Sequence, residues 1–422
     1  MKIAVIGAGA AGCFFANVLR QLRPRMIIDM YESGQRPLRK VAITGGGRCN
    51  LTNTFAEVRD LQQVYPRGYN LMKRLLRQFD HEATMRWFEE RGVALVVQSD
   101  QCVFPASQDA MQIVGTLMEG MQGVRIFCNE RVRNIVVCEN ADVCEANRSP
   151  YRVVTDKRDE AYDVVIVTSG GSPRATGLNF LDGLQLEMVA PVPSLFSFNI
   201  GADKAGSDVR ELMGIVVDDA MTSLAGTRFK SYGPLLITHW GMSGPAILRL
   251  SSAAARWLAE RDYRATLLVN WMGGVGEDVV RERLRSQLAE QPSRQIGGLH
   301  LLTSRLWNHL LKRAGIAPER RCSEVGSKQL NKLASVLTND NYAITGQCRT
   351  KDEFVTCGGV ALSNVDPATL QCRRHPGIYL AGEVLDVDGV TGGFNLQAAW
   401  TMGYTVAHAI DQMLSGSAQN DM

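Results

Sequence analysis

The sequence predicts an α/β protein built on a parallel sheet that binds a dinucleotide. Three stretches carry this prediction: a strand, glycine turn and helix within residues 1–32, an apolar strand run at 163–167 that leads into small residues, and a third strand at 377–383 followed by glycines and a helical pattern. Strand runs that alternate with helical patterns are typical of a parallel sheet with crossover helices. At 422 residues, the chain is long enough for two or three domains.

The first stretch has the element order of a dinucleotide-binding unit. Its first glycine, Gly7, permits a tight turn, Gly9 lets backbone amides approach a pyrophosphate, and Gly12 allows close packing of helix and strand. Glu32 ends the second strand and is placed to accept hydrogen bonds from ribose hydroxyls. The elements in order are a strand at residues 3–6, the turn, a helical pattern at 14–22 and a strand at 27–31. This motif alone does not distinguish FAD from a nicotinamide cofactor.

A second glycine cluster, TGGGRCN at residues 44–50, follows soon after the first. A glycine run can lie flat against a planar ring or a ribityl chain, because no Cβ holds the ligand away. Arg48 and Asn50 can then bond to phosphate or to ring heteroatoms.

Two later strand ends favour FAD. The run 163–171 ends in Ser-Gly-Gly, and GIYLAGE at 377–383 ends in glycine and a carboxylate. VTGGFNLQAA at 390–399 is typical of the start of a helix, which we expect to run to about Leu414. Unpaired N–H groups at such a terminus stabilise an anionic reduced flavin ring. Sites from both ends of the chain thus converge on one long, flat cofactor.

The same residues resemble a known family. The blocks GAGAAG, TGGGRCNLTN, FPAS at 104–107, THWGMSGPAIL at 238–248, TCGGV at 356–360 and GIYLAGEVLDVDGVTGGFNLQAAW at 377–400 are similar to those of the bacterial BaiN/RdsA flavoproteins. That family, described as NAD(P)/FAD-dependent oxidoreductases, includes aminoacetone oxidases and a proposed bile-acid-pathway reductase. The resemblance covers essentially the whole chain. It implies a discontinuous Rossmann-like FAD domain interrupted by a β-barrel-like insert that carries a small helical subdomain.

This resemblance also implies domain limits. Short alternating β runs and later helical patterns at 277–290, 303–314 and 326–338 agree with an insert. The expected limits are 1–193 and 343–422 for the FAD domain, 194–275 and about 316–342 for the barrel-like insert, and 276–315 for the helical subdomain. Within the insert, LLVNWMGGVGEDVVRERL has strand, glycines and helix in order, but Val279 stands where a third glycine is needed. We interpret it as a plain strand-to-helix turn.

The expected FAD contacts come from both ends of the chain. The resemblance places residues Thr44 to Asn50 along the flavin and its ribityl arm. The resemblance is interrupted at Ser172–Phe180, where relatives have a different sequence, so no cofactor contacts are inferred for those residues. The full set is Gly7, Gly9, Ala11, Gly12, Glu32, Ser33, Lys40, Thr44, Gly45, Gly46, Gly47, Arg48, Cys49, Asn50, Val132, Ser169, Gly170, Gly171, Gly382, Glu383, Gly393, Phe394, Asn395 and Leu396.

Two residues are candidates for catalysis. Arg48 can stabilise a reduced flavin or a carboxylate, or else make only a phosphate or surface contact. His239 can act as a general acid, or else bond to backbone and fix its own turn. Cys49 is interpreted as a small structural residue, because disulfide-exchanging flavoenzymes need a second cysteine beside the ring.

Composition limits the other classes. The net charge of +3 predicts no strong field for nucleic acid or a membrane surface. The ten cysteines include no C-x-x-C pair and no zinc spacing, so we expect reduced thiols, no metal and a cytoplasmic protein. No run is long enough to span a membrane.

The predicted function is a flavin-dependent oxidoreductase that passes hydride from NAD(P)H through FAD to a small organic acceptor or to oxygen. Three alternatives stay open: an amine or amino-ketone oxidase that uses oxygen without nicotinamide, a tRNA-modifying flavoenzyme, and a non-enzymatic FAD-binding redox sensor. The sequence leaves the substrate, the donor and the oligomeric state undetermined.

Overall fold

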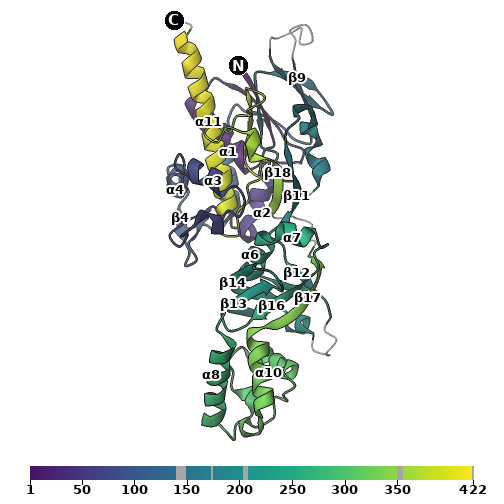
Figure 1. The fold of residues 1–422 in the computed structure, drawn as a ribbon. Coiled ribbons are helices and arrows are strands. Elements are labelled where there is room, and N and C mark those ends of the chain that lie inside the picture. Colours follow the sequence, from purple (N-terminus) through teal and green to yellow (C-terminus); the bar gives the residue numbers. More distant parts are fainter. Residues whose placement is uncertain (139–148, 173, 203–207, 349–354, 421–422) are drawn as a thin grey trace. The chain divides into compact units, whose positions relative to one another are not determined.

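The computed structural model describes residues 1–138, 149–172, 174–202, 208–348 and 355–420. The chain forms two compact units, one of Met1–Val192 with Val355–Met422 and one of Pro193–Phe354. The first is called the nucleotide unit below and the second the insert unit (Figure 1).

The nucleotide unit is built on a parallel sheet in the order β19-β10-β1-β2-β6. The central strands are almost wholly buried, as expected for a parallel sheet that is covered on both faces. The strands are β1 Lys2–Ile6, β2 Ile27–Tyr31, β6 Arg125–Phe127, β10 Val164–Val167 and β19 Ile378–Leu380. The predicted α/β class and its three diagnostic strands are confirmed.

Two helices from opposite ends of the chain pack together in this unit. Helix α1, Ala10–Leu22, lies beside α11, Phe394–Asn420 (Figure 1). The two backbones come so close at Gly403 that a Cβ there would lie 2.7 Å from the Ala11 carbonyl oxygen. The C-terminal helix is thereby held against the helix that follows the first glycine turn.

Smaller elements surround this framework. The helices are α2 Arg39–Gly47, α3 Tyr69–Leu75, α4 His81–Glu89 and α5 Ala110–Glu119, with 3-10 helices η1 Leu61–Gln63, η2 Ala175–Leu184 and η6 Leu362–Asn364. The additional strands are β3 Thr52–Asn53, β4 Leu95–Val97, β5 Cys102–Pro105, β7 Val132–Val137, β8 Tyr151–Thr155, β9 Asp159–Tyr162, β11 Met188–Ser194 and β18 Val355–Val360. They form the sheets β3-β5-β4, β7-β8-β9 and β11-β18. The part of the divergent segment that is described packs as η2 against β7, with buried leucines at 178, 181 and 184.

The insert unit contains a closed barrel in the order β12-β15-β14-β13-β16-β17, as the family resemblance implies. Its strands are β12 Phe198–Ile200, β13 Val216–Leu224, β14 Lys230–Ile237, β15 Gly241–Ser243, β16 Ala265–Asn270 and β17 Asp340–Gln347. Helices α6 Pro245–Ala253 and α7 Ala255–Ala259 and the 3-10 helix η3 Val209–Leu212 accompany it.

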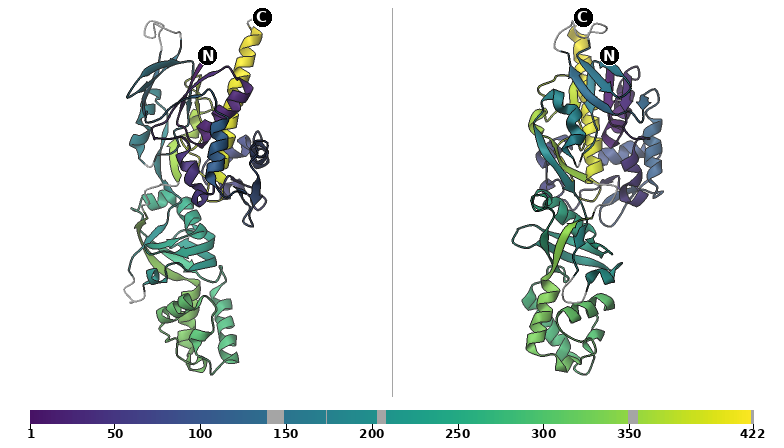
Figure 2. Two further views of the ribbon diagram at one scale, coloured as in Figure 1. Left: turned by 180° about the vertical axis from the view of Figure 1, so that it is seen from behind. Right: turned by 90° about the vertical axis from the view of Figure 1, so that its right-hand side faces the viewer.

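Beyond one end of the barrel, three helices and two 3-10 turns form the helical part of the insert unit (Figures 1 and 2). They are α8 Glu277–Glu290, α9 Ser304–Arg313, α10 Ser327–Thr338, η4 Ile296–Gly298 and η5 Cys322–Glu324. Their inward faces share one hydrophobic core with the barrel, including Leu284, Trp307 and Leu333.

The expected domain limits need two corrections. Residues 343–347 belong to the barrel rather than to the FAD domain, because β17 pairs with both β12 and β16 and closes the barrel. Residues 327–338 are helical and pack on α8, so the helical part does not end at residue 315. Both errors have one cause: the chain leaves the barrel for the helices and must return to it to supply the last strand.

The glycines after β16 form a turn, as interpreted from the sequence. The Asn270 side-chain oxygen accepts hydrogen bonds from the N–H groups of Met272 and Gly274, at 2.9 and 3.1 Å. A Cβ at Gly273 would overlap the Asp219 carboxylate. Protein atoms thus occupy the space beside this glycine, and β16 runs antiparallel to both neighbours.

The structure also bears on two expectations about the whole chain: reduced thiols and no membrane-spanning segment. Among the described cysteines, eight belong to no disulfide, but Cys138 is disulfide-bonded, so the expectation of reduced thiols is wrong at that position. Within the described residues, no helix combines the length and the apolar character needed to cross a bilayer.

Candidate cofactor site

The first glycine turn is shaped by contacts within the protein at two of its three glycines. Gly7 has φ +105° and its N–H donates to the Tyr31 carbonyl at 2.8 Å. A Cβ at Gly7 would lie 2.8 Å from the Ser169 Cα, and one at Gly12 would lie 2.5 Å from the Thr168 hydroxyl oxygen. These two glycines therefore let the turn and α1 sit against the end of β10.

Gly9 is different, because a Cβ there would meet no protein atom within 4 Å. Its φ of −88° is accessible to any residue, so the fold itself does not require glycine. Gly9 is the N-cap of α1, which has no side-chain cap and no acidic residue in its first turn. Free N–H groups and an approachable backbone at a helix N-terminus suit a pyrophosphate.

Glu32 is held at the edge of this turn by backbone donors. Its Oε2 accepts from the Ala8 N–H at 3.1 Å and its Oε1 from the Gly34 N–H at 2.6 Å. The Oε1 also accepts from the Ser33 hydroxyl at 3.5 Å, and the Oε2 keeps a second lone pair for a ribose hydroxyl. The exposed Ser33 lies beside Glu32, and the Glu130 N–H donates to the Glu32 carbonyl at 2.9 Å. That contact brings the start of β7, where Val132 is buried, next to the same loop.

The second glycine cluster leaves helical geometry where the sequence suggests a flat ligand surface. Thr44 has ψ 149°, and Gly45 and Gly46 are left-handed with φ 59° and 70°; Gly47 follows with φ 84°. A Cβ at Gly46 or Gly47 would meet no protein atom within 4 Å. The backbone of residues 46–47 therefore presents an open face to a ligand.

Arg48 and Cys49 follow this face and do different things. The Arg48 Nε donates to the Gly45 carbonyl at 3.1 Å, and its guanidinium lies 4.5 Å from the centre of the Phe104 ring. Arg48 thus braces the glycine run. Cys49 has no exposed surface, and burial raises the pKa of its thiol to about 12. A thiol that stays protonated is a poor nucleophile, which supports its structural interpretation.

Gly382 and Glu383, just beyond β19, together contact four separate segments. Its Oε1 accepts from the Thr356 N–H at 2.8 Å, and its Oε2 accepts from the Lys40 ammonium at 3.1 Å. A Cβ at Gly171 would lie 2.8 Å from the Glu383 Oε1. The neighbouring Gly382 approaches α1, where its Cβ would lie 3.0 Å from the Ala11 Cβ. The loop at Ser169–Gly171 is thereby placed beside α2, β18 and the first turn.

The loop before α11 is joined directly to the second glycine cluster. The Asn50 amide oxygen accepts from the Gly393 N–H at 3.2 Å, and its nitrogen donates to the Thr52 carbonyl at 3.1 Å. Gly393 has φ +89°, and a Cβ there would lie 2.3 Å from the Thr52 carbonyl oxygen. Asn395 then closes the loop by exchanging two 2.7 Å hydrogen bonds with the backbone of Gly389.

Phe394 and Leu396 begin α11 beside this loop. Phe394 is buried against the rings of Phe55 and Tyr65, with ring centres 5.1 and 6.0 Å away, and the Tyr65 hydroxyl donates to the Phe394 carbonyl at 2.8 Å. Leu396 is half-buried. Phe394 is therefore a core aromatic that anchors the helix start.

Taken together, the residues of the nucleotide unit fit FAD. The open backbone at Gly9 would hold the pyrophosphate, Glu32 the adenosine ribose, and residues 46–47 with the start of α11 the flavin end. When bound, FAD supplies two-electron hydride transfer.

His239 lies in the insert unit, at the tip of the hairpin formed by β14 and β15. It is exposed and its ring contacts Trp240 edge-on, with centres 4.3 Å apart. Among the described residues its imidazole has no hydrogen-bond partner. The Thr238 hydroxyl oxygen fixes the turn instead, by accepting from the Gly241 N–H at 3.1 Å, so the alternative that His239 holds its own turn is wrong.

Sequence reasoning missed several residues that hold this site together. The Thr168 hydroxyl donates to the Gly7 carbonyl at 2.8 Å, and Thr52 donates to the Gln397 side chain at 2.5 Å. Arg67 forms a bidentate pair with Asp388, whose side chain is fully buried. Thr168 and Asp388 lie beside glycine motifs that are recognisable in the sequence. No local pattern, however, indicates which distant residue each of these two side chains contacts.

The comparison with known families identifies the chain. The family described as "HI0933-like protein Rossmann domain" matches residues 1–409. The chain belongs to this family. The resemblance to the BaiN/RdsA flavoproteins is thereby confirmed, and the protein is a flavin-dependent oxidoreductase.

Relatives of the HI0933-like protein span nearly its full length. The ribosomal RNA dihydrouridine synthase of Escherichia coli K12 is 26% identical over 414 residues, 96% of each chain. The 3-dehydro-bile acid delta(4,6)-reductase of Clostridium scindens is 24% identical over 420 residues, 97% of this chain and 98% of that one. The structure of 3-ketosteroid delta1-dehydrogenase from Sterolibacterium denitrificans matches with a TM-score of 0.51 at 12% identity, over 98% and 99% of the two chains. This last likeness concerns the fold alone.

Proposed function

We propose that this HI0933-like protein is an FAD-dependent reductase that saturates a carbon–carbon double bond conjugated to a carbonyl group, with NAD(P)H as donor and a uracil ring of ribosomal RNA as acceptor. One observation carries the flavin part of the proposal. Open backbone at Gly9 and at residues 46–47, the carboxylates Glu32 and Glu383, and the start of α11 all belong to one compact unit.

The relatives support the choice of acceptor. A dihydrouridine synthase and a delta(4,6)-reductase are both named for removing a carbon–carbon double bond, and in uracil that bond is conjugated to a ring carbonyl. The dihydrouridine synthase of Haemophilus influenzae is also 25% identical over 97% of this chain. Near-neutral charge argued against a nucleic-acid partner, but net charge averages over the whole chain and leaves room for local arginine clusters.

The overall reaction balances as one hydride and one proton. The donor becomes NAD(P)⁺, its hydride, which carries the electron pair, ends on the carbon β to the carbonyl, and a proton adds to the α carbon. Glu32, Lys40 and Glu383 would position the cofactor, while Arg48 braces the glycine run. We assign His239 as the proton donor, since its imidazole is exposed and unpaired among the described residues.

Two measurements test this proposal. Anaerobic titration with NADH and then NADPH, followed by the visible flavin spectrum, is expected to bleach the cofactor with one donor. An unchanged spectrum with both, but bleaching by amines, would support the oxidase alternative; a spectrum unchanged by every donor would support the redox sensor.

The second measurement concerns the acceptor. Ribosomal and transfer RNA from a deletion strain are digested to nucleosides and analysed by mass spectrometry. We expect loss of a dihydrouridine from ribosomal RNA and its return on complementation. Unchanged ribosomal RNA contradicts the acceptor, and a loss confined to transfer RNA would move the activity there.

A further inference from the structure

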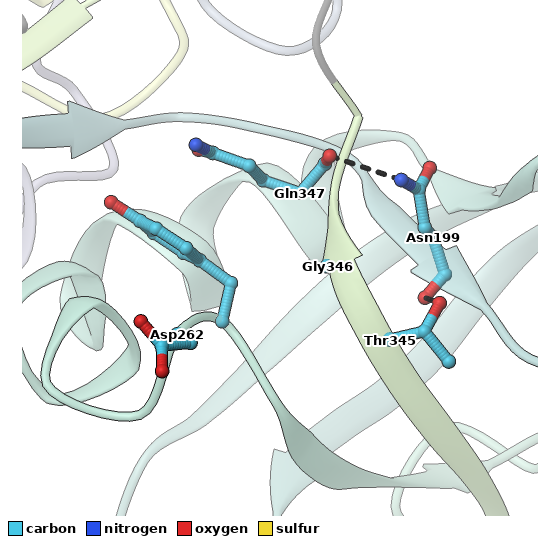
Figure 3. Close-up of a pocket in the computed structure, with 6 residues that line it drawn as sticks. Asn199, Asp262, Thr345, Gly346 and Gln347 are labelled. Carbon is cyan, nitrogen blue, oxygen red and sulfur yellow. Dashed lines mark hydrogen bonds between the residues drawn. The ribbon is translucent and has the colours of Figure 1, made fainter.

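A pocket of about 360 Å³ lies in the insert unit, apart from the residues that fit FAD (Figure 3). It opens between two barrel strands and the turn that follows α7. The lining residues are Asn199 of β12, Asp262 and Tyr263 of the turn, and Thr345, Gly346 and Gln347 of β17. Its volume is at the lower end of the range for small-molecule sites, so it suits a group about as large as one nucleoside.

The backbone around the pocket is irregular in two places. The pairing of β12 with β17 shifts between Asn199 and Ile200, so that Thr345 is an extra residue in β17. Across the pocket, Asp262 and Tyr263 are consecutive left-handed residues with φ 49° and 56°. Bulges often redirect side chains beside binding sites, and non-glycine residues with positive φ are disfavoured unless their surroundings impose that conformation.

The pocket presents hydrogen-bonding groups that the protein does not use. The Asn199 amide nitrogen donates to the Gln347 carbonyl at 3.0 Å, which leaves its side-chain oxygen available. Among the described residues, neither the Gln347 side-chain amide nor the Asp262 carboxylate has a hydrogen-bond partner. In Figure 3, Asp262 lies on one side and Asn199, Thr345 and Gly346 on the other, with the Gln347 side chain extending between them.

This combination recognises a nucleobase better than other ligands. Two amides offer both donors and acceptors, a carboxylate accepts from ring or exocyclic N–H groups, and the Tyr263 ring offers an apolar face. An anion would meet Asp262 with no cation in the lining. A metal ion would have only one carboxylate ligand in this lining, and an apolar ligand would leave the two side-chain amides without hydrogen-bond partners.

The segment beside the pocket alternates arginines with aromatic residues, as R-W-L-A-E-R-D-Y-R over 256–264. The Arg261 guanidinium lies 4.1 Å from the centre of the Trp257 ring, donates to the Trp257 carbonyl at 3.1 Å and pairs with the exposed Glu260 carboxylate at 3.4 Å, which a phosphate would replace. Arg264 is exposed, and its guanidinium has no hydrogen-bond or ion-pair partner in the described part of the chain. Arginines beside an aromatic face are typical of single-stranded RNA sites, where they meet phosphates while a base stacks.

We propose that this pocket binds one unpaired base of an RNA, distinct from the uracil that is reduced, and that Arg261 and Arg264 contact its neighbouring phosphates. The inference rests on the proposed function for the choice of RNA as partner. It makes the barrel the part of the protein that reads RNA structure, a role separate from holding the cofactor.

The test uses the full-length protein with FAD bound and a fluorescently labelled, mixed-sequence single-stranded RNA of twelve nucleotides, followed by anisotropy. Gln347→Leu and the nearly isosteric Asp262→Asn are each expected to weaken binding about fivefold, the effect of one lost hydrogen bond. Gln62→Leu, at an exposed glutamine of η1 in the other unit, is the matched control and is expected to change nothing. Flavin absorbance and the melting temperature establish that each variant is folded.

A second pair of variants distinguishes specific RNA binding beside the pocket from nonspecific attraction of the RNA phosphates to any exposed arginine. Arg264→Gln is expected to weaken binding about three- to tenfold and to lower the salt slope by about 0.7, as for one phosphate contact. Arg283→Gln is the control, because the Arg283 side chain is on the exposed face of α8 and has no side-chain partner among the described residues. Equal losses in both variants, or a duplex bound as tightly as the single strand, would overturn the proposal.

The remaining measurements distinguish a free nucleotide from RNA as the ligand, and failure of the pocket proposal from failure of the proposed function. UMP and GMP are titrated alone: binding of a mononucleotide as tight as that of the RNA would assign the pocket to a free nucleotide and refute the RNA role. Pocket variants that bind RNA normally, while the deletion strain loses its dihydrouridine, refute the pocket and keep the function. Binding that depends on Gln347 in a strain with unchanged ribosomal RNA keeps the pocket and refutes the function.

Discussion

The contrast between Gly9 and Gly12 tests whether the first turn is shaped by a ligand or by the protein. We consider Gly9→Ala and Gly12→Ala. At Gly9 the new methyl group meets no protein atom within 4 Å, and at Gly12 it lies 2.5 Å from the Thr168 hydroxyl oxygen and overlaps the Gly7 carbonyl. The same chemical change should therefore act on two different equilibria.

For Gly9→Ala, the loss of a favourable N-cap residue and the lower entropy of the unfolded chain act in opposite directions. The unfolding free energy of the cofactor-free protein should then stay within about 1 kcal/mol of the wild type. The methyl group does occupy the approach to α1. If it removes one charge-assisted hydrogen bond to the pyrophosphate, worth about 1.5–3 kcal/mol, the Kd for FAD rises about 10- to 150-fold.

For Gly12→Ala, the methyl group overlaps backbone and a buried hydroxyl that cannot both move. Overpacking of this kind costs about 3 kcal/mol, and a domain of this size loses about 2–4 °C in Tm per kcal/mol. A Tm lower by about 6–12 °C is therefore expected before any cofactor is added.

The assay is thermal unfolding of the cofactor-free proteins, with FAD affinity measured by quenching of flavin fluorescence. The reasoning is refuted if Gly9→Ala destabilises the cofactor-free protein as much as Gly12→Ala does, or if Gly9→Ala binds FAD as tightly as the wild type. Gly9→Val, with a larger side chain in the same open space, is expected to abolish FAD retention.

Three further predictions concern single side chains. Burial raises the pKa of the Cys49 thiol to about 12, so roughly one Cys49 thiol in ten thousand is ionised at pH 8. We therefore expect iodoacetamide to modify the half-buried Cys128 well before Cys49, as followed by mass spectrometry of the native protein. Equal rates of modification at the two cysteines would contradict this. Asn395→Ala removes both 2.7 Å bonds to Gly389 and should lower the free energy of unfolding by about 2 kcal/mol in urea titrations. Asn395→Asp keeps the acceptor for the Gly389 N–H but sets a carboxylate oxygen against the Gly389 carbonyl, so it should lose at least as much at pH 7; a wild-type midpoint for both variants would contradict this. His239→Ala should keep the flavin spectrum and reduce kcat about 10²- to 10⁴-fold if the imidazole donates the proton; a steady-state rate equal to that of the wild type would remove His239 from the mechanism.

The first glycine turn is the part of the site that a short stretch of sequence predicts best. Strand, glycines, helix and Glu32 all lie within one β-α-β unit, where backbone geometry limits which residues fit each position. Predicted helix limits were close for the same reason: 277–290, 303–314 and 326–338 became Glu277–Glu290, Ser304–Arg313 and Ser327–Thr338. The barrel boundary was harder, because β17 pairs with strands that precede it by many residues.

By itself, the sequence determined the α/β class, the dinucleotide motif and the identity of the second glycine cluster as a place of close approach. Only the tertiary structure decided how these parts meet. Asn50 bonds to Gly393, and Glu383 bonds to Thr356 and Lys40. Glycine geometry is a property of a few neighbouring residues and leaves a local pattern, whereas a hydrogen bond between residues hundreds of positions apart depends on how the sheet and helices pack, which no short pattern encodes.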